Sequence, residues 1–429
     1  SFQMGAALVL LAVAFVLAFN ADGLVTGFAL LGTLLIGAAL ALPPVLNGVL
    51  AFASGQARSV TAQWFWADTR QQLPGLSLAL MALMLAIAAN IGVSTMVSSF
   101  RLTFTGFLDQ RLASELYIST DSAEQTAALV AFAEGAGAAV LPIQSADVQI
   151  AGQPAEVFGT RDHATYRDNW RFLQSTPAAW DATFAGQAVV INEQLARRAG
   201  LSLGDPVAIG ALTLPVAGIY GDYGNPIGQV VLALDAFALQ FPGVEPRQFG
   251  LRVAGDPADF VTGLTEATGI GAGQTIDQAG IKALSLAIFE RTFTVTTALN
   301  ILTLAVAGFA ILMSLLTLAA MRVPQLAPAW AMGMTRAALG RLELLRAVML
   351  AVLTAALALP LGLALAWVLL AVVNVAAFGW QLPMYLFPLD YARLGGFALL
   401  AAVLAAGWPA WRLARTPPGD LLKVFANER

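Results

Sequence analysis

The feature that most constrains this chain is a set of long stretches almost without charge. The stretch 24–57 is mostly apolar and contains no charged residue. A bilayer core is about 30 Å thick, so a helix that spans it needs about 20 mainly apolar residues. Because lipid offers the backbone no hydrogen-bonding partners, such stretches must be helical. They predict an α-helical transmembrane protein.

About six stretches satisfy this requirement. Met4–Phe19 and a stretch that begins at Leu24 are separated by turn residues, which predicts a hairpin. Pro360 lies inside the fifth stretch and predicts a kink, so it is a candidate hinge. Spans three to six are expected at about Leu76–Phe100, Thr292–Met321, Ala347–Asn374 and Leu394–Trp411.

Charge is concentrated between the third and fourth spans. Residues 101–291 hold 20 of the 26 acids and 11 of the 22 bases, a net charge of −9, and the rest of the chain has 6 acids and 11 bases. Strand-like runs such as Val216–Tyr220 occur beside helix-like runs such as Ser122–Glu134 and Glu193–Ala199, the last of which stops at Gly200. An acidic α+β domain is therefore expected here.

The expected organisation has four parts. Residues 1–53 form a transmembrane hairpin, and 54–100 form a cytoplasmic segment that leads into span three. Residues 101–291 form the extracytoplasmic α+β domain, and 292–429 hold three spans, a cytoplasmic coupling segment and a tail. The chain starts with Ser1 and lacks a clear signal peptide, so we expect it to begin inside a longer protein.

The basic residues predict the orientation. Ten of them lie before span three, between spans four and five or in the tail, whereas only Arg393 lies in the opposite short turns. Cytoplasmic loops are enriched in Lys and Arg, so both termini are expected in the cytoplasm and 101–291 outside. Tryptophans near span ends, including Trp380, are expected to anchor the chain at the membrane interface.

The residues predict no catalytic, cofactor-binding or metal site. The chain has no cysteine and a single histidine, His163, which excludes cysteine and histidine metal clusters. Neither Lys282 nor Lys423 follows a glycine, so there is no P-loop for ATP. No basic run indicates nucleic-acid binding. His163 could belong to a hydrolase triad, but a polar surface loop is the simpler interpretation.

Few polar groups are expected inside the membrane. Asn90 and Asn300 are buried-amide candidates, and a hydrogen bond to a neighbouring helix explains either one. Glu343 and Arg346 lie at the cytoplasmic end of span five. Ion-coupled carriers keep charges at mid-membrane, and these spans lack them, so a secondary transporter is disfavoured.

The most informative stretch lies between spans four and five, at Arg322–Arg336. Exposed Trp and Met side chains beside Arg suit docking on a partner, although an interfacial connector would have the same composition. Thr335 is a candidate N-cap for the helix that continues into the membrane.

Motifs along the chain resemble FtsX-like permeases of ABC transporters, the group that includes the MacB and LolE types. The likeness covers about residues 60–429, and the leading hairpin is similar to that of larger YbbP-type permeases with two modules. On this resemblance the chain is the C-terminal half of such a permease. The motifs are Trp66–Arg70, Glu115–Ser119, Val190–Ala196 with Gly204-Asp205, Ala331–Thr335, and Pro409–Arg415 with Pro417.

The resemblance implies a non-catalytic permease subunit on which a separate cytoplasmic ABC ATPase docks. The family usually has an acid where Gln325 stands and a base where Trp330 stands, so this sequence departs from the pattern at both positions. ATP hydrolysis would move the outer domain to export or extract a lipid-like, lipoprotein or other hydrophobic substrate. The candidate docking residues are Gln325, Trp330, Met332, Gly333, Met334, Thr335 and Arg336.

The resemblance also implies a bacterial cytoplasmic (inner) membrane protein. Expected partners besides the ATPase are the N-terminal half of the same permease or a second copy, the lipid membrane, and an extracytoplasmic protein as a further candidate. The main alternative is a membrane-anchored scaffold or signalling protein that activates an outer partner without transporting a substrate. A membrane enzyme is the third hypothesis.

Overall fold

The structure, a computed structural model, describes residues 2–331 and 333–415, without the side chains of 292, 296, 297, 300, 317–331, 336 and 412–414. The described residues form two compact units. The first is built from 1–99, 293–376 and 383–429, and the second from 100–292 and 377–382. The predicted architecture, long apolar helices with an inserted α+β domain between them, is confirmed.

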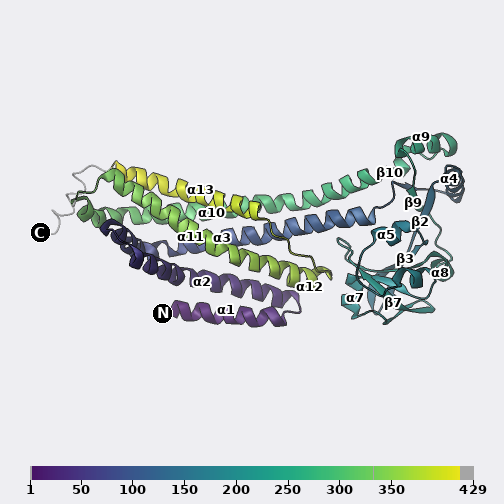
Figure 1. Ribbon diagram of the computed structural model, residues 1–429, viewed down its shortest axis with the longest axis horizontal. Coiled ribbons are helices and arrows are strands. Elements are labelled where there is room, and N and C mark those ends of the chain that lie inside the picture. The colour runs from purple at the N-terminus through teal and green to yellow at the C-terminus, as the bar shows by residue number, and fades with distance from the viewer. Residues whose placement is uncertain (1, 332, 416–429) are drawn as a thin grey trace. The chain divides into compact units, whose positions relative to one another are not determined.

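Long apolar helices build the first unit, with α1 beside α2 and α11 beside α13 (Figure 1). Two of them, α3 and α10, also contain residues of the second unit. A π-helical segment, Leu369–Val373, and the short helix α12, Asn374–Phe378, follow α11 directly. The long helices are α1 Phe2–Asn20, α2 Leu24–Gln56, α3 Val60–Arg111, α10 Gln278–Ala331, α11 Arg336–Val368 and α13 Pro388–Ala414.

Five helical stretches of the described chain are long and apolar enough to cross a membrane. The predicted fourth span lies in α10, whose shorter apolar stretch Ile301–Leu316 has described side chains. The helices also extend beyond the predicted spans, because composition marks only their apolar part. The five stretches are Phe2–Asn20, Leu24–Gln56, Val60–Arg111, Ala337–Phe378 and Pro388–Trp411.

Buried Leu, Ala and Ile side chains of α2, α3, α10, α11 and α13 fill the centre of the helical unit. Gly362 of α11 lies close against α3. A Cβ atom at this position would lie 2.6 Å from the Cβ of Ile91 and 3.0 Å from the carbonyl oxygen of Ala88. Membrane helices pack this closely only where small residues let the backbones meet.

Hydrogen bonds between side chains also join the helices. Asn90 of α3 is buried, and its Nδ2 donates to the carbonyl oxygen of Ala86 at 2.6 Å and to Thr303 Oγ1 of α10 at 3.0 Å. The hydroxyls of Thr95 and Tyr391 lie 2.9 Å apart between α3 and α13. The expected bond from Asn90 to a neighbouring helix is confirmed. The side chain of Asn300 lies outside the described residues.

The second unit contains a ten-stranded sheet in the order β10-β1-β9-β2-β3-β8-β5-β7-β4, with β6 paired to β7. Most neighbours are antiparallel, but β3 pairs with β8 and β5 with β7 in parallel. The strands are β1 Leu116–Ser119, β2 Ala139–Ile150, β3 Gln153–Thr160, β4 Phe172–Ser175, β5 Val189–Asn192, β6 Pro206–Ile209, β7 Leu212–Tyr220, β8 Gly228–Ala233, β9 Gln248–Arg252 and β10 Thr275–Asp277.

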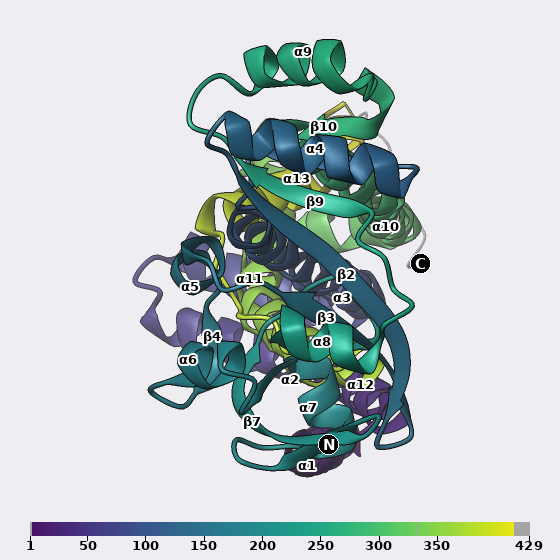
Figure 2. The same cartoon turned by 90° about the vertical axis from the view of Figure 1, so that its right-hand side faces the viewer.

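The two largest hydrophobic clusters of this unit lie one at each half of the sheet. The first joins α4 and α9 to β1, β2 and β9, and Figure 2 shows α4 and α9 beside β9 and β10. The second joins α7 and α8 to β3, β5, β7 and β8. The long strand β2 pairs with β9 along its first half and with β3 along its second, so it connects the two halves. The helices are α4 Ala123–Gly135, α5 Ala164–Asn169, α6 Ala179–Phe184, α7 Glu193–Ala199, α8 Leu234–Gln240 and α9 Pro257–Thr268, with a 3₁₀ turn at Ala272–Gln274.

Helix α7 has the predicted bounds and ends at the predicted glycine. Asn192 caps α7 by accepting a hydrogen bond from the backbone N–H of Leu195 at 3.1 Å, and Gly200 ends the helix in the left-handed conformation at φ 65°. The same Asn192 side chain accepts from the N–H of Gln229 at 2.8 Å, which ties the cap to β8. A polar residue directly after a β-branched strand therefore serves both the helix and the sheet.

The segment 377–382 belongs to the second unit and contacts α7. Arg198 donates to the carbonyl oxygen of Phe378 at 3.2 Å, and the N–H of Gln381 donates to Glu193 at 3.3 Å. Trp380 is only 3% exposed, so the predicted interfacial anchor is wrong at this position. Gly379, at φ 83°, turns the chain close to α7, and the indole is buried there.

Candidate coupling site

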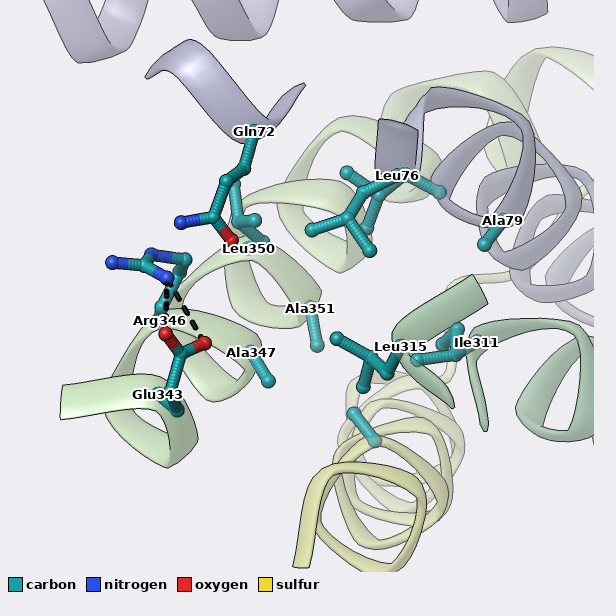
Figure 3. A pocket seen from close by; sticks show the side chains of 12 residues that line it. Gln72, Leu76, Ala79, Ile311, Leu315, Glu343, Arg346, Ala347, Leu350 and Ala351 are labelled. Atoms are coloured by element: carbon teal, nitrogen blue, oxygen red, sulfur yellow. Dashed lines mark hydrogen bonds and ion pairs between the residues drawn. The ribbon is translucent and has the colours of Figure 1, made fainter. Parts of the chain in front are cut away.

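One charged side chain is almost completely buried among the helices of the first unit. Arg346 of α11 is 2% exposed, and it contacts both its own helix and α3. Its Nη1 donates to both carboxylate oxygens of Glu343 at 2.9 Å (Figure 3). Its Nη2 donates to Asp68, and its Nε donates to Thr69 Oγ1 at 3.0 Å. Every nitrogen of this guanidinium therefore has a partner.

The α3 side of this network is one face of the helix. Phe65, Asp68, Thr69 and Gln72 are spaced by three or four residues, which places them above one another. Gln72 donates to Asp68 at 3.0 Å, and the Phe65 ring centroid lies 5.7 Å from the Arg346 guanidinium carbon. Hydrogen bonds between ionised partners are about twice as strong as neutral ones. The network therefore connects α3 and α11 firmly.

A small cavity of about 20 Å³ lies beside the network. Gln72, Glu343 and Arg346 line it on one side, and apolar side chains such as Leu76 and Leu315 line the other (Figure 3). Helices α3, α10, α11 and α13 all contribute to its walls. A water molecule needs roughly 10–15 Å³, so the cavity has room for about one water and not for a substrate.

The predicted docking segment lies shortly before this network. Thr335 caps α11 as predicted, because its Oγ1 accepts a hydrogen bond from the backbone N–H of Ala338 at 3.2 Å. Gly333 is exposed at φ 102°, and Met334 is half-buried. Met332 and the side chains of Gln325, Trp330 and Arg336 lie outside the described residues, so ATPase docking on this segment stays a prediction.

Two family models match parts of the chain. The model described as FtsX-like permease C-terminal matches residues 297–418, and the MacB-like periplasmic core domain matches residues 76–262. The chain resembles FtsX-like permeases that have a MacB-like periplasmic core domain. Permeases of this family are non-catalytic membrane subunits of ABC transporters, which agrees with the prediction that the chain is not an enzyme.

One curated relative aligns with most of the chain. The uncharacterized ABC transporter permease protein Rv0987 of Mycobacterium tuberculosis is 27% identical over 427 residues, which cover 92% of this chain and 49% of that protein. The chain therefore spans about half the length of this relative.

Two solved structures resemble part of the chain. The periplasmic region of MacB from Actinobacillus actinomycetemcomitans has 13% identity and a TM-score of 0.30, covering 40% of this chain and 94% of that one. The extracellular domain of the noncanonic ABC-type transporter YknZ from Gram-positive bacteria has 14% identity and a TM-score of 0.28, covering 38% and 98%.

In this chain, reasoning from the sequence alone found only one side of the buried network around Arg346. It placed Glu343 and Arg346 together at the end of span five, but it did not find their α3 partner. A signal was available, because Asp68 is the only acid among residues 54–100. A buried cation needs a nearby counter-charge.

Two other residues singled out from the sequence have clear surroundings. His163 accepts a hydrogen bond from the backbone N–H of Thr165 at 3.1 Å and so caps α5, a structural role. Pro360 lies inside α11, which continues through it to Val368, and the contact with α3 at Gly362 follows two residues later. The hinge role of Pro360 stays a prediction.

Proposed function

We propose that this chain couples ATP hydrolysis by a separate cytoplasmic ABC ATPase to movement of its periplasmic domain. The movement exports or extracts a lipid-like, lipoprotein or other hydrophobic substrate. The protein lies in a bacterial cytoplasmic membrane with both termini inside. Its further partners are the N-terminal half of the same permease or a second copy, and an extracytoplasmic protein. The 49% coverage of the mycobacterial relative supports the two-module arrangement.

The Arg346 network is the observation that carries this proposal. The proposed docking segment leads into α11 at Arg336, and Arg346 lies ten residues later, about 15 Å along the helix. A push on the start of α11 would be transmitted to Asp68 and Thr69 of α3 through hydrogen bonds that involve an ionised donor. α3 then continues without a break to Arg111, in the second unit.

Reversing the charge at the docking segment is expected to release the ATPase. With Arg336→Glu, the ATPase that co-purifies with the full-length protein should fall by about tenfold, the effect of about 1.4 kcal/mol. Arg393→Glu is the matched control, since it makes the same charge change near the start of α13, on the proposed non-cytoplasmic side. Equal recovery with both variants would move the docking site elsewhere. If no ATPase co-purifies with the wild-type protein, the result favours the alternative proposal, a scaffold or signalling protein, over the permease.

The proposed orientation can be tested cleanly because the chain has no cysteine. Glu124→Cys in α4 and Arg341→Cys in α11 each place one thiol at an exposed position. A membrane-impermeant maleimide added to intact cells, with the outer membrane permeabilised where there is one, should label only Glu124→Cys. Both variants should react after the inner membrane is opened. Labelling of Arg341→Cys in intact cells would reverse the orientation.

A further inference from the structure

A cavity of about 210 Å³ lies inside the second unit, where α3 ends. Its walls come from the last residues of α3, from β1, β2, β3 and β9, and from α5 with the residue that follows it. One water molecule needs roughly 10–15 Å³, so this cavity can hold a small organic molecule. It is about ten times larger than the cavity beside Arg346.

The lining combines apolar walls with a few polar groups. Leu141, Phe158 and Trp170 are among its apolar lining residues, and Arg111 and Tyr166 are among its polar ones. Small-molecule sites typically have this composition, in which apolar side chains supply the contact area and a few polar groups orient the ligand.

Arg111 places a guanidinium group at the wall of the cavity. Its guanidinium carbon lies 4.0 Å from the Trp170 ring centroid, and its Nη2 donates to Gln229 Oε1 at 2.9 Å. Its Nη1 is buried and has no hydrogen-bond partner in the described part of the chain. The nearby Glu115 pairs with Arg252 at 3.0 Å instead. No described carboxylate therefore forms an ion pair with Arg111.

The tyrosines of the cavity do not offset this charge. Burial raises the pKa of Tyr166 to about 12, although Arg111 and Arg161 act in the opposite direction. Burial also raises the pKa of Tyr117. Both hydroxyls therefore stay protonated at physiological pH, neutral and able to donate a hydrogen bond.

We propose that this cavity binds a small organic anion, with its carboxylate toward Arg111 and its apolar body among Leu141, Phe158 and Trp170. An anion supplies the counter-charge that Arg111 lacks among the described residues. The cavity wall includes Arg111 and Leu112, where α3 ends, so a bound ligand contacts the end of the helix to which we assign coupling. Binding itself does not depend on the proposed transport function.

The test is isothermal titration calorimetry of the full-length protein in lipid nanodiscs. The probes are phenylacetate and hexanoate, with neutral phenylacetamide as the isosteric control for charge. A ligand of this size is expected to bind with a Kd on the order of 1 mM or tighter. Phenylacetamide should bind at least about tenfold more weakly than phenylacetate, because it lacks the charge that pairs with the guanidinium. Whichever of phenylacetate and hexanoate binds more tightly shows whether the cavity prefers an aryl or an alkyl ligand.

Arg111→Met should abolish phenylacetate binding while it keeps the apolar length of the side chain. Arg171→Met is the matched control, because this substitution removes the same charge. Arg171 is exposed and follows Trp170 in the chain, but it does not line this cavity. Tyr166→Phe covers the case in which Arg111→Met fails to fold. It removes only one hydroxyl and should weaken binding severalfold.

Four results would overturn the proposal. The first is no binding of either acid to the wild type. The second is equal binding of phenylacetate and phenylacetamide. The third is unchanged binding to folded Arg111→Met or, where that variant does not fold, to Tyr166→Phe. Loss of binding in Arg171→Met to the same degree as in Arg111→Met would also contradict it, because the effect would then follow net charge and not the cavity.

Discussion

Replacing Arg346 with methionine is expected to lower the free energy of unfolding of the helical unit by about 3–5 kcal/mol. The guanidinium is 2% exposed and is shared by Asp68 and Glu343, which are themselves mostly buried. Methionine fills a similar volume but removes the cation that both carboxylates share. The measurement is reversible unfolding of the full-length protein in mixed lipid and detergent micelles. Arg341→Met, an exposed change on the same helix, should shift stability by no more than about 0.5 kcal/mol.

A triple variant separates a structural role of this network from a coupling role. Replacing a whole buried ion network with apolar residues is often neutral or stabilising, so Asp68→Leu, Glu343→Leu and Arg346→Leu together should recover stability. We expect the triple variant to bind the ATPase but to lose the response of ATP hydrolysis to the permease. If it is both stable and fully coupled, the network is only structural. If Arg346→Met is as stable as the wild type, the network contributes nothing measurable.

Replacing Gly362 with alanine is expected to destabilise the same unit by about 1–3 kcal/mol. The added methyl group would lie 2.6 Å from the Cβ of Ile91 and 3.0 Å from a backbone oxygen of α3, so the two helices must separate. This cost opposes the gain of about 1 kcal/mol that alanine normally brings inside a helix. The unfolding assay used for Arg346→Met also measures this effect.

The matched control for Gly362→Ala is Gly396→Ala in α13. Gly396 is also inside a helix, but a Cβ atom there would have no neighbour within 4 Å. Gly396→Ala should therefore be neutral or slightly stabilising. Equal stability of the two variants would mean that α3 and α11 do not meet at the backbone.

Much of the local structure could be predicted because it depends on residues close in sequence. The span that begins at Leu24, the cap at Thr335 and the helix stop at Gly200 each follow from a few neighbouring residues. The predicted strand near Val216–Tyr220 is found within β7 for the same reason. The order of the sheet did not follow, because the parallel pairing of β3 with β8 joins segments that are more than 60 residues apart.

In the candidate site, too, some features depend on neighbouring residues and others on tertiary packing. The sequence by itself determined a helical membrane protein, an inserted α+β domain and a family resemblance, since length, hydropathy and short motifs are properties of contiguous residues. Tertiary structure alone decided that Arg346 pairs with Asp68, 278 positions away, and that Arg111 meets Trp170 and Gln229. The physical reason is that a buried charge takes whichever partner the packing brings near, and the residues next to Arg346 or Arg111 do not specify a partner that is distant in the sequence.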